Sequence, residues 1–167
     1  MRATLSVWIL GAWLGGTLFM WTVATQNFRV VDRLLSAPAA GFRERIQGET
    51  RLVMRHQASE LNRLYFQYWG WAQLALGLAL AALIFPTPAG RLVKLAAAAM
   101  LVIVAVLQFY VVPETIRLGR LLDFAARTPP PPEEAPFWRL HSVYTILDSL
   151  KLVAGLVASW RFLSSRG

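Results

Sequence analysis

The chain has 167 residues, of which 56% are apolar and only 16% are charged, and its formal net charge is +8. It contains no cysteine, which excludes disulfides, cysteine-bound zinc and cysteine-bound iron–sulfur clusters. Soluble domains carry about a quarter charged residues, whereas the charges here lie between long apolar runs. The composition predicts an all-α integral membrane protein in contact with membrane lipids. We expect the excess arginine residues to contact anionic lipid headgroups or to set the membrane topology, and not to bind nucleic acid.

Four segments are predicted to cross the membrane, at about residues 5–25, 64–85, 92–112 and 140–162. The uncharged runs that carry the first three are each at least as long as the roughly 18 residues that indicate a spanning helix. A chain of this length cannot build a soluble core that would bury such helices. The turn PTPAGR joins the second and third segments into an antiparallel hairpin. The prediction is a single membrane domain, a bundle of four transmembrane helices.

The first segment is predicted to be an uncleaved helix and not a signal peptide. Its apolar part is too long for a signal sequence, and the nearest A-x-A pattern, at 37–39, comes well past its end. It contains GAWLGGTLF, in which Gly11 and Gly15 have the G-x-x-x-G spacing and Gly16 lies alongside. Such residues let another backbone approach closely, and Gly155 is a similar helix-packing position in the fourth segment. The partner is either another span or a second copy of the chain.

The two long connections, residues 27–63 and 114–127, have the apolar spacing of amphipathic helices. Helices that lie on the membrane surface and helices that extend the spans both fit this pattern. Pro38 and Gly41 predict a break, and a proline-rich spacer at 128–136 precedes the fourth span. The long connections hold eleven Lys and Arg residues, against five at the opposite end. This count favours long connections on the cytoplasmic side of a bacterial inner membrane.

The fourth segment differs from the others because it carries charges in its interior. On a helical wheel, His141, Thr145 and Asp148 fall on one polar stripe with Lys151 beside them. The i, i+3 spacing of Asp148 and Lys151 allows an ion pair. Both charges must lie at membrane depth, because the residues beyond Lys151 are too few to cross. The stripe is either a functional pathway or ligand site, or a buried clasp that holds the helices in register.

The histidines and methionines give little support for a metal or haem site. His56, the only other histidine, lies in the polar connection, where we expect a solvated or headgroup-facing side chain. A bis-histidine haem needs two axial ligands at membrane depth. Motifs of soluble enzymes and paired carboxylates within one span are absent. We therefore predict no catalytic residue, no metal and no haem or other cofactor.

Three short stretches, AWLGGTLF, VVPETI and FWRLH, resemble the tetraspan membrane family typified by transmembrane protein 205, which in turn resembles the CopD-like membrane proteins. The resemblance implies four membrane helices with helical extensions at two connections. Members have been linked to export of metal-containing compounds, and CopD-like relatives to copper uptake and haem-dependent porphyrinogen oxidation. The haem-using relatives have a histidine in the first span, which this chain lacks. The matching positions are Trp13, Gly15, Gly16, Pro113, Phe137 and His141.

Packing surfaces are many in this sequence and catalytic groups are few. This balance predicts a non-enzymatic accessory or assembly subunit of a membrane complex, with a protein partner in the membrane or a second copy. One alternative is a small transporter of a solute or metal-containing compound that uses the polar stripe. Another is a redox protein associated with haem or quinone.

Overall fold

The computed structural model describes residues 2–37, 49–126 and 128–164, and all regular structure within them is helical. Four of its helices are long and apolar enough to cross a membrane, which confirms the all-α architecture with four long helices. The third of these is continuous from Arg91 to Leu122 and is made of three parts. In chain order the elements are α1 (Arg2–Ser36), α3 (Thr50–Ile84), α4 (Arg91–Val106), η1 (Leu107–Val111), α5 (Val112–Leu122) and α6 (Glu134–Ser164).

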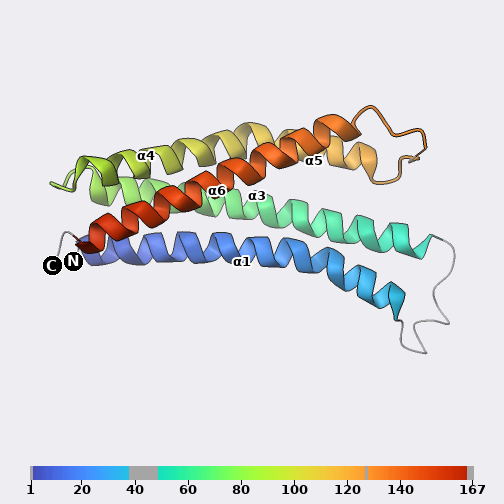
Figure 1. The fold of residues 1–167 in the computed structure, drawn as a ribbon, viewed down its shortest axis with the longest axis horizontal. Helices are drawn as coiled ribbons and strands as arrows, with labels where there is room; N and C mark the ends of the chain where they lie inside the picture. The colour runs from blue at the N-terminus through green and yellow to red at the C-terminus, as the bar shows by residue number, and fades with distance from the viewer. Residues whose placement is uncertain (1, 38–48, 127, 165–167) are drawn as a thin grey trace.

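Successive long helices run antiparallel, so the two chain ends and the short turn between α3 and α4 lie at one end of the bundle (Figure 1). The end of α1, the start of α3, the end of α5 and the start of α6 lie at the opposite end. α1 packs against α3 and α6, and α4 packs against the same two helices. Each helix therefore has two neighbours, and a single interior is enclosed between them.

Where the structure describes the amphipathic segments, they extend the long helices. Residues 27–36 continue α1, residues 50–63 begin α3, and residues 114–122 end α5. A helix of 35 residues, such as α1 or α3, is about 52 Å long, whereas a hydrocarbon core is about 30 Å thick. The amphipathic parts lie at the end of the bundle opposite the turn between α3 and α4, and we call residues 27–36, 50–63 and 114–123 the extension. The predicted break at Pro38 and Gly41 lies outside the described residues.

The fourth long helix begins at Glu134, earlier than the predicted Leu140, so its first turn includes the last residues of the expected proline-rich spacer. Pro136 fits in a first turn because the backbone N–H that proline lacks has no partner there. Glu134 in the same turn is favourable because its negative charge meets the positive end of the helix dipole.

The third helix continues through Pro113, which lies where the predicted third span meets the predicted helical connection. Proline lacks an N–H donor, and its ring clashes with the carbonyl four residues earlier in a regular α-helix. The π-helical turn η1, Leu107–Val111, comes directly before it and widens the helix at this point. The Thr115 hydroxyl donates to the Val111 carbonyl at 2.7 Å. The helix therefore continues through Pro113 into α5.

The apolar core lies in the half of the bundle that contains the chain ends. It is formed by buried residues of α1, α3 and α4, namely Leu10, Trp13, Leu80, Ile84, Val93, Ala97, Met100 and Val104. Two of the predicted packing glycines serve this interior. A side chain at Gly16 would overlap the Trp69 ring, and one at Gly155 would come within 2.6 Å of Leu14. Gly11 and Gly15 face open space, so neither packs against another helix in the part of the chain that the structure describes.

Candidate functional site

The two charges inside the fourth long helix are buried and face each other. Asp148 and Lys151 lie one turn apart on α6, and their side chains are 1% and 0% exposed. The Lys151 ammonium donates to Asp148 Oδ1 and to Gln73 Oε1. The ion pair expected from their spacing therefore forms in the interior of the bundle.

Aromatic and amide side chains from the neighbouring helices complete the pair. Trp21 Nε1 donates to Asp148 Oδ2 at 2.7 Å. Trp13 Nε1 donates to Gln73 Oε1 at 3.0 Å, so this amide oxygen accepts from both Trp13 and Lys151. We call these five residues, from α1, α3 and α6, the polar clasp: Trp13, Trp21, Gln73, Asp148 and Lys151.

The polar clasp is neutral and closed. Both carboxylate oxygens of Asp148 accept a hydrogen bond, and the Lys151 ammonium donates to two oxygens. A buried ion pair is tolerated only when such additional hydrogen bonds offset the loss of water. Four cavities between the described helices are lined by other side chains. Of the two hypotheses for the stripe, this geometry favours the clasp that joins helices.

His141 and Thr145, which share the predicted stripe, are not part of the polar clasp. Both are exposed, and the Thr145 hydroxyl donates to the His141 carbonyl of its own helix. The His141 ring stacks on Phe137 and meets the edge of Trp138. His141 and Asp148 share a wheel position but lie about 10 Å apart along the helix axis. The stripe is therefore divided between the interior, where Asp148 lies, and the exposed surface of α6, where His141 and Thr145 lie.

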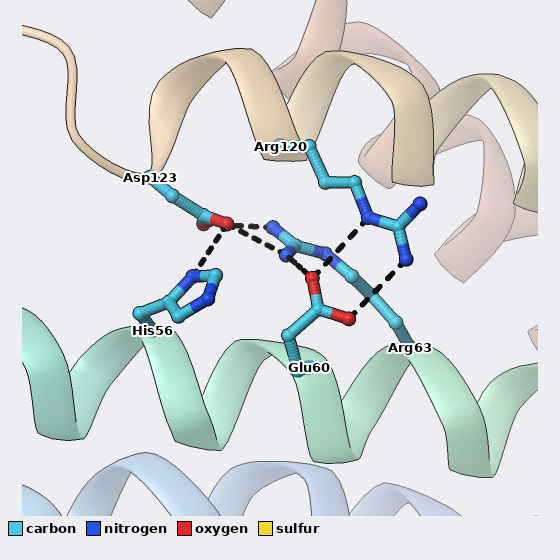
Figure 2. A network of polar contacts seen from close by, with 5 residues as sticks. All are labelled: His56, Glu60, Arg63, Arg120 and Asp123. Atoms are coloured by element: carbon cyan, nitrogen blue, oxygen red, sulfur yellow. Dashed lines mark hydrogen bonds and ion pairs between the residues drawn. The ribbon is translucent and has the colours of Figure 1, made fainter.

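A second polar centre lies in the extension and joins α3 to α5 (Figure 2). We call it the charged network; it consists of His56, Glu60, Arg63, Arg120 and Asp123. Arg63 binds the Asp123 carboxylate through two N–H groups, at 2.7 and 2.8 Å. Arg63 also donates to Glu60 at 2.5 Å, and Arg120 donates to both Glu60 oxygens at 3.2 and 3.3 Å. His56 Nδ1 lies 2.9 Å from Asp123 Oδ2.

Sequence reasoning missed the charged network. We expected His56 to be solvated, but its ring contacts Asp123 and also packs against Phe124 with centroids 4.8 Å apart. The i, i+4, i+7 spacing of His56, Glu60 and Arg63 was a usable signal, because it places all three on one helix face. Nothing in the sequence places Asp123 opposite that face.

The charged network has ligand types that also bind metals. The ligand atoms of His56, Glu60 and Asp123 all lie within 4.8 Å of one another. However, Arg63 and Arg120 already bind both carboxylates, and their two positive charges balance the two negative ones. A divalent cation would have to displace guanidinium groups that are hydrogen-bonded in place. The donor set therefore fits an ion-paired lock between helices better than a metal centre.

Two adjoining cavities lie between the helices of the extension. The larger has a volume of about 790 Å³ and borders the charged network, and the smaller has a volume of about 160 Å³. Arginines on the rim of the larger cavity are partly neutralised, since Arg51 and Arg55 both contact Asp32. The residues shared by both cavities are mostly aromatic or polar: Phe28, Ser59, Asn62, Arg63, Phe66, Phe137 and His141.

Comparison of the chain with models of protein families, with curated proteins and with solved structures finds no match in any of the three. The positions that carry the resemblance to the tetraspan family have varied environments. Trp13 belongs to the polar clasp, and Gly16 packs against Trp69. Phe137 lies between His141 and Gly119, whereas Gly15 faces outward. The resemblance therefore stays a prediction.

Proposed function

We propose that this chain is an integral protein of the bacterial inner membrane, that its four long helices cross the bilayer, and that it acts as a non-enzymatic accessory or assembly subunit of a membrane complex. The observation that carries the proposal is the saturated polar clasp. Its charged groups are bound within the chain and are not presented to a substrate. Membership of the tetraspan family is part of the same proposal.

The free-energy cost of placing Asp148 and Lys151 in a bilayer explains why both side chains need partners in the polar clasp. Asp and Lys near the centre of a membrane helix cost roughly 2.5 to 3.5 kcal/mol each. The nine Val, Ile, Leu and Phe residues between positions 143 and 162 return roughly 0.3 to 0.6 kcal/mol each. The balance is close to zero at best, so α6 is stable in a bilayer only when α1 and α3 supply partners. Lys151 lies midway along the proposed fourth span, where such partners matter most.

The accessory role follows from where the remaining polar and apolar surfaces lie. The charged network neutralises itself between α3 and α5, as the clasp does between α1, α3 and α6. The Gly11 and Gly15 strip of α1, in contrast, is open toward the outside of the bundle. A flat strip of this kind is a contact surface for a helix of a partner protein or a second copy. The pattern supports a subunit that holds others and does no chemistry itself.

Site-specific photo-crosslinking in native membranes tests this role. A photoreactive side chain at outward-facing Gly15 is expected to capture one protein in a fixed ratio, either a different subunit or a second copy. The same group at Thr17, which is buried on the same helix, is the matched control and should capture none. The accessory role is wrong if neither position yields a product and the native protein is monomeric. Solute flux in proteoliposomes that the variant Asp148→Asn/Lys151→Met abolishes without unfolding would support the transporter instead.

The orientation and the absence of haem can be measured on the same material. The chain contains no cysteine, so single cysteines at Pro88 and Pro130 can be labelled without background. We propose that the long connections are cytoplasmic; an impermeant maleimide added outside cells should then label Pro88→Cys and leave Pro130→Cys unlabelled. The reverse labelling would invert the orientation. The purified protein should show no Soret absorbance.

A further inference from the structure

At the end of the bundle opposite the extension, a cavity of about 700 Å³ opens between α1, the α3–α4 turn and α6. Figure 1 shows the start of α1, the end of α6 and this turn gathered at that end. Three arginines line the cavity, Arg2, Arg91 and Arg161, each from a different helix. Leu83, Val93 and Phe162 form part of its apolar wall. We call it the terminal cavity.

The terminal cavity has no compensating negative side chain. The chain has nine Asp and Glu residues; one is Asp148 of the polar clasp, and the other eight lie in the long connections or in the parts of α1, α3, α5 and α6 next to them. In the charged network, by comparison, each arginine contacts a carboxylate. Among the described residues, none of the three guanidinium groups of this cavity has a carboxylate partner, a condition that an anion would relieve.

Two helix N-termini and two helix C-termini meet at the terminal cavity, so their partial charges largely offset each other and the positive charge comes from the arginine side chains. α1 and α4 both begin at the terminal cavity, and neither has an acidic residue in its first turn. Acidic residues are favoured at such positions because the N-terminus of a helix carries partial positive charge. Here Arg2 and Arg91 occupy the first positions instead. The sequence therefore places positive charge where a helix by itself would favour negative charge.

We propose that the terminal cavity binds the phosphate of an anionic phospholipid. The guanidinium groups of Arg2, Arg91 and Arg161 would contact the phosphate oxygens, a pairing for which their planar donors are well suited. The apolar wall would receive the first carbons of an acyl chain. The inference rests on the proposed membrane insertion, which places the helix ends at headgroup depth. Basic pockets between membrane helices are known to bind anionic headgroups.

Lipid titration of the full-length protein in nanodiscs tests the proposal. The probe is fluorescent phosphatidylglycerol, titrated into nanodiscs of phosphatidylcholine that contain the wild-type chain. The test variant is Arg2→Gln/Arg91→Gln/Arg161→Gln. The matched control is Arg29→Gln/Arg33→Gln/Arg139→Gln, which removes the same number of charges from the extension side. Circular dichroism and thermal melting confirm that both variants stay folded.

We expect the test variant to bind phosphatidylglycerol on the order of 100-fold more weakly, because each basic residue contributes roughly a five-fold factor in affinity. The control should change less than about three-fold, since its charges do not face the cavity. Equal losses in both variants would overturn the site, because net charge alone would then explain binding. Inorganic phosphate is titrated in a parallel arm; if it binds as tightly as the lipid, the lipid assignment is wrong.

The outcomes also separate this inference from the proposal on which it rests. A wild-type chain that enters nanodiscs but shows no preference for phosphatidylglycerol over phosphatidylcholine overturns the lipid site alone. A chain that remains outside nanodiscs and stays soluble without detergent overturns both the membrane insertion and the lipid site.

Discussion

Removing one charge of the polar clasp should destabilise the protein far more than removing both. Lys151→Met leaves the Asp148 carboxylate, which is 1% exposed, with Trp21 as its remaining described donor. Breaking a buried pair in this way costs about 3 to 5 kcal/mol, because the remaining charge is still desolvated. Asp148→Asn leaves the Lys151 ammonium with Gln73 and a neutral amide, at a similar cost.

The double variant Asp148→Asn/Lys151→Met carries no charge at this depth. Its amide can still accept from Trp21, so we expect a loss of only about 1 to 2 kcal/mol, the scale of a weakened hydrogen-bond group. The double variant should therefore be more stable than either single variant. The measurement is the free energy of unfolding of the reconstituted protein, obtained by steric trapping in bicelles.

The ion pair between Glu114 and Arg117 is a matched control within the same chain. It has the same i, i+3 spacing, but its side chains are 35% and 59% exposed. Neutralising either residue should leave the free energy of unfolding close to that of the wild-type chain, as for other exposed surface pairs. If the clasp variants are as mild as these, and their effects simply add, burial of the pair contributes no coupled energy and the clasp interpretation is refuted.

Three further predictions concern packing and the charged network. Gly16→Leu should lose about 1 to 3 kcal/mol of unfolding free energy because its side chain would overlap a neighbouring ring, whereas Gly11→Leu should change it by less than about 0.5 kcal/mol. Asp123→Asn weakens the paired hydrogen bonds from Arg63 and should lower the free energy of unfolding by about 1 to 3 kcal/mol. Its control is Asp32→Asn, at an exposed ion pair, which should lower the free energy of unfolding by less than about 1 kcal/mol. Stoichiometric zinc should leave the melting temperature unchanged, and a rise would show that the charged network does bind a metal.

The polar clasp shows which contacts a sequence can and cannot predict. The pairing of Asp148 with Lys151 is local and follows from helix geometry, and burial of both charges follows from their cost in lipid. The partners Trp21 and Gln73 lie far along the chain from the pair. Their contacts depend on how α1 and α3 rotate about their axes, and the apolar pattern of a membrane helix encodes this rotation weakly because nearly every face is apolar.

The extension shows a different limit. Amphipathic periodicity predicted helices in both long connections, but surface helices and continuous extensions have the same periodicity. Proline usually interrupts a regular helix, but the helix continues through Pro113 because a π-helical turn precedes it. A π-helical turn contains one more residue per hydrogen-bonded turn than an α-helix, and no sequence motif marks it. Its effect on the direction of the helix is therefore seen only in the structure.

The two ends of the bundle differ in how their arginines are neutralised, and one change of ionic strength tests both ends. In the extension five arginines contact carboxylates of the same chain, namely Arg51, Arg55, Arg63, Arg117 and Arg120, and the Asp123 side chain is only 8% exposed. At the terminal cavity the arginines are exposed and have no acidic side chain nearby. Salt screens exposed charges strongly and buried pairs weakly. Raising the ionic strength should therefore release phosphatidylglycerol from the terminal cavity while leaving the stability contributed by Asp123 nearly unchanged.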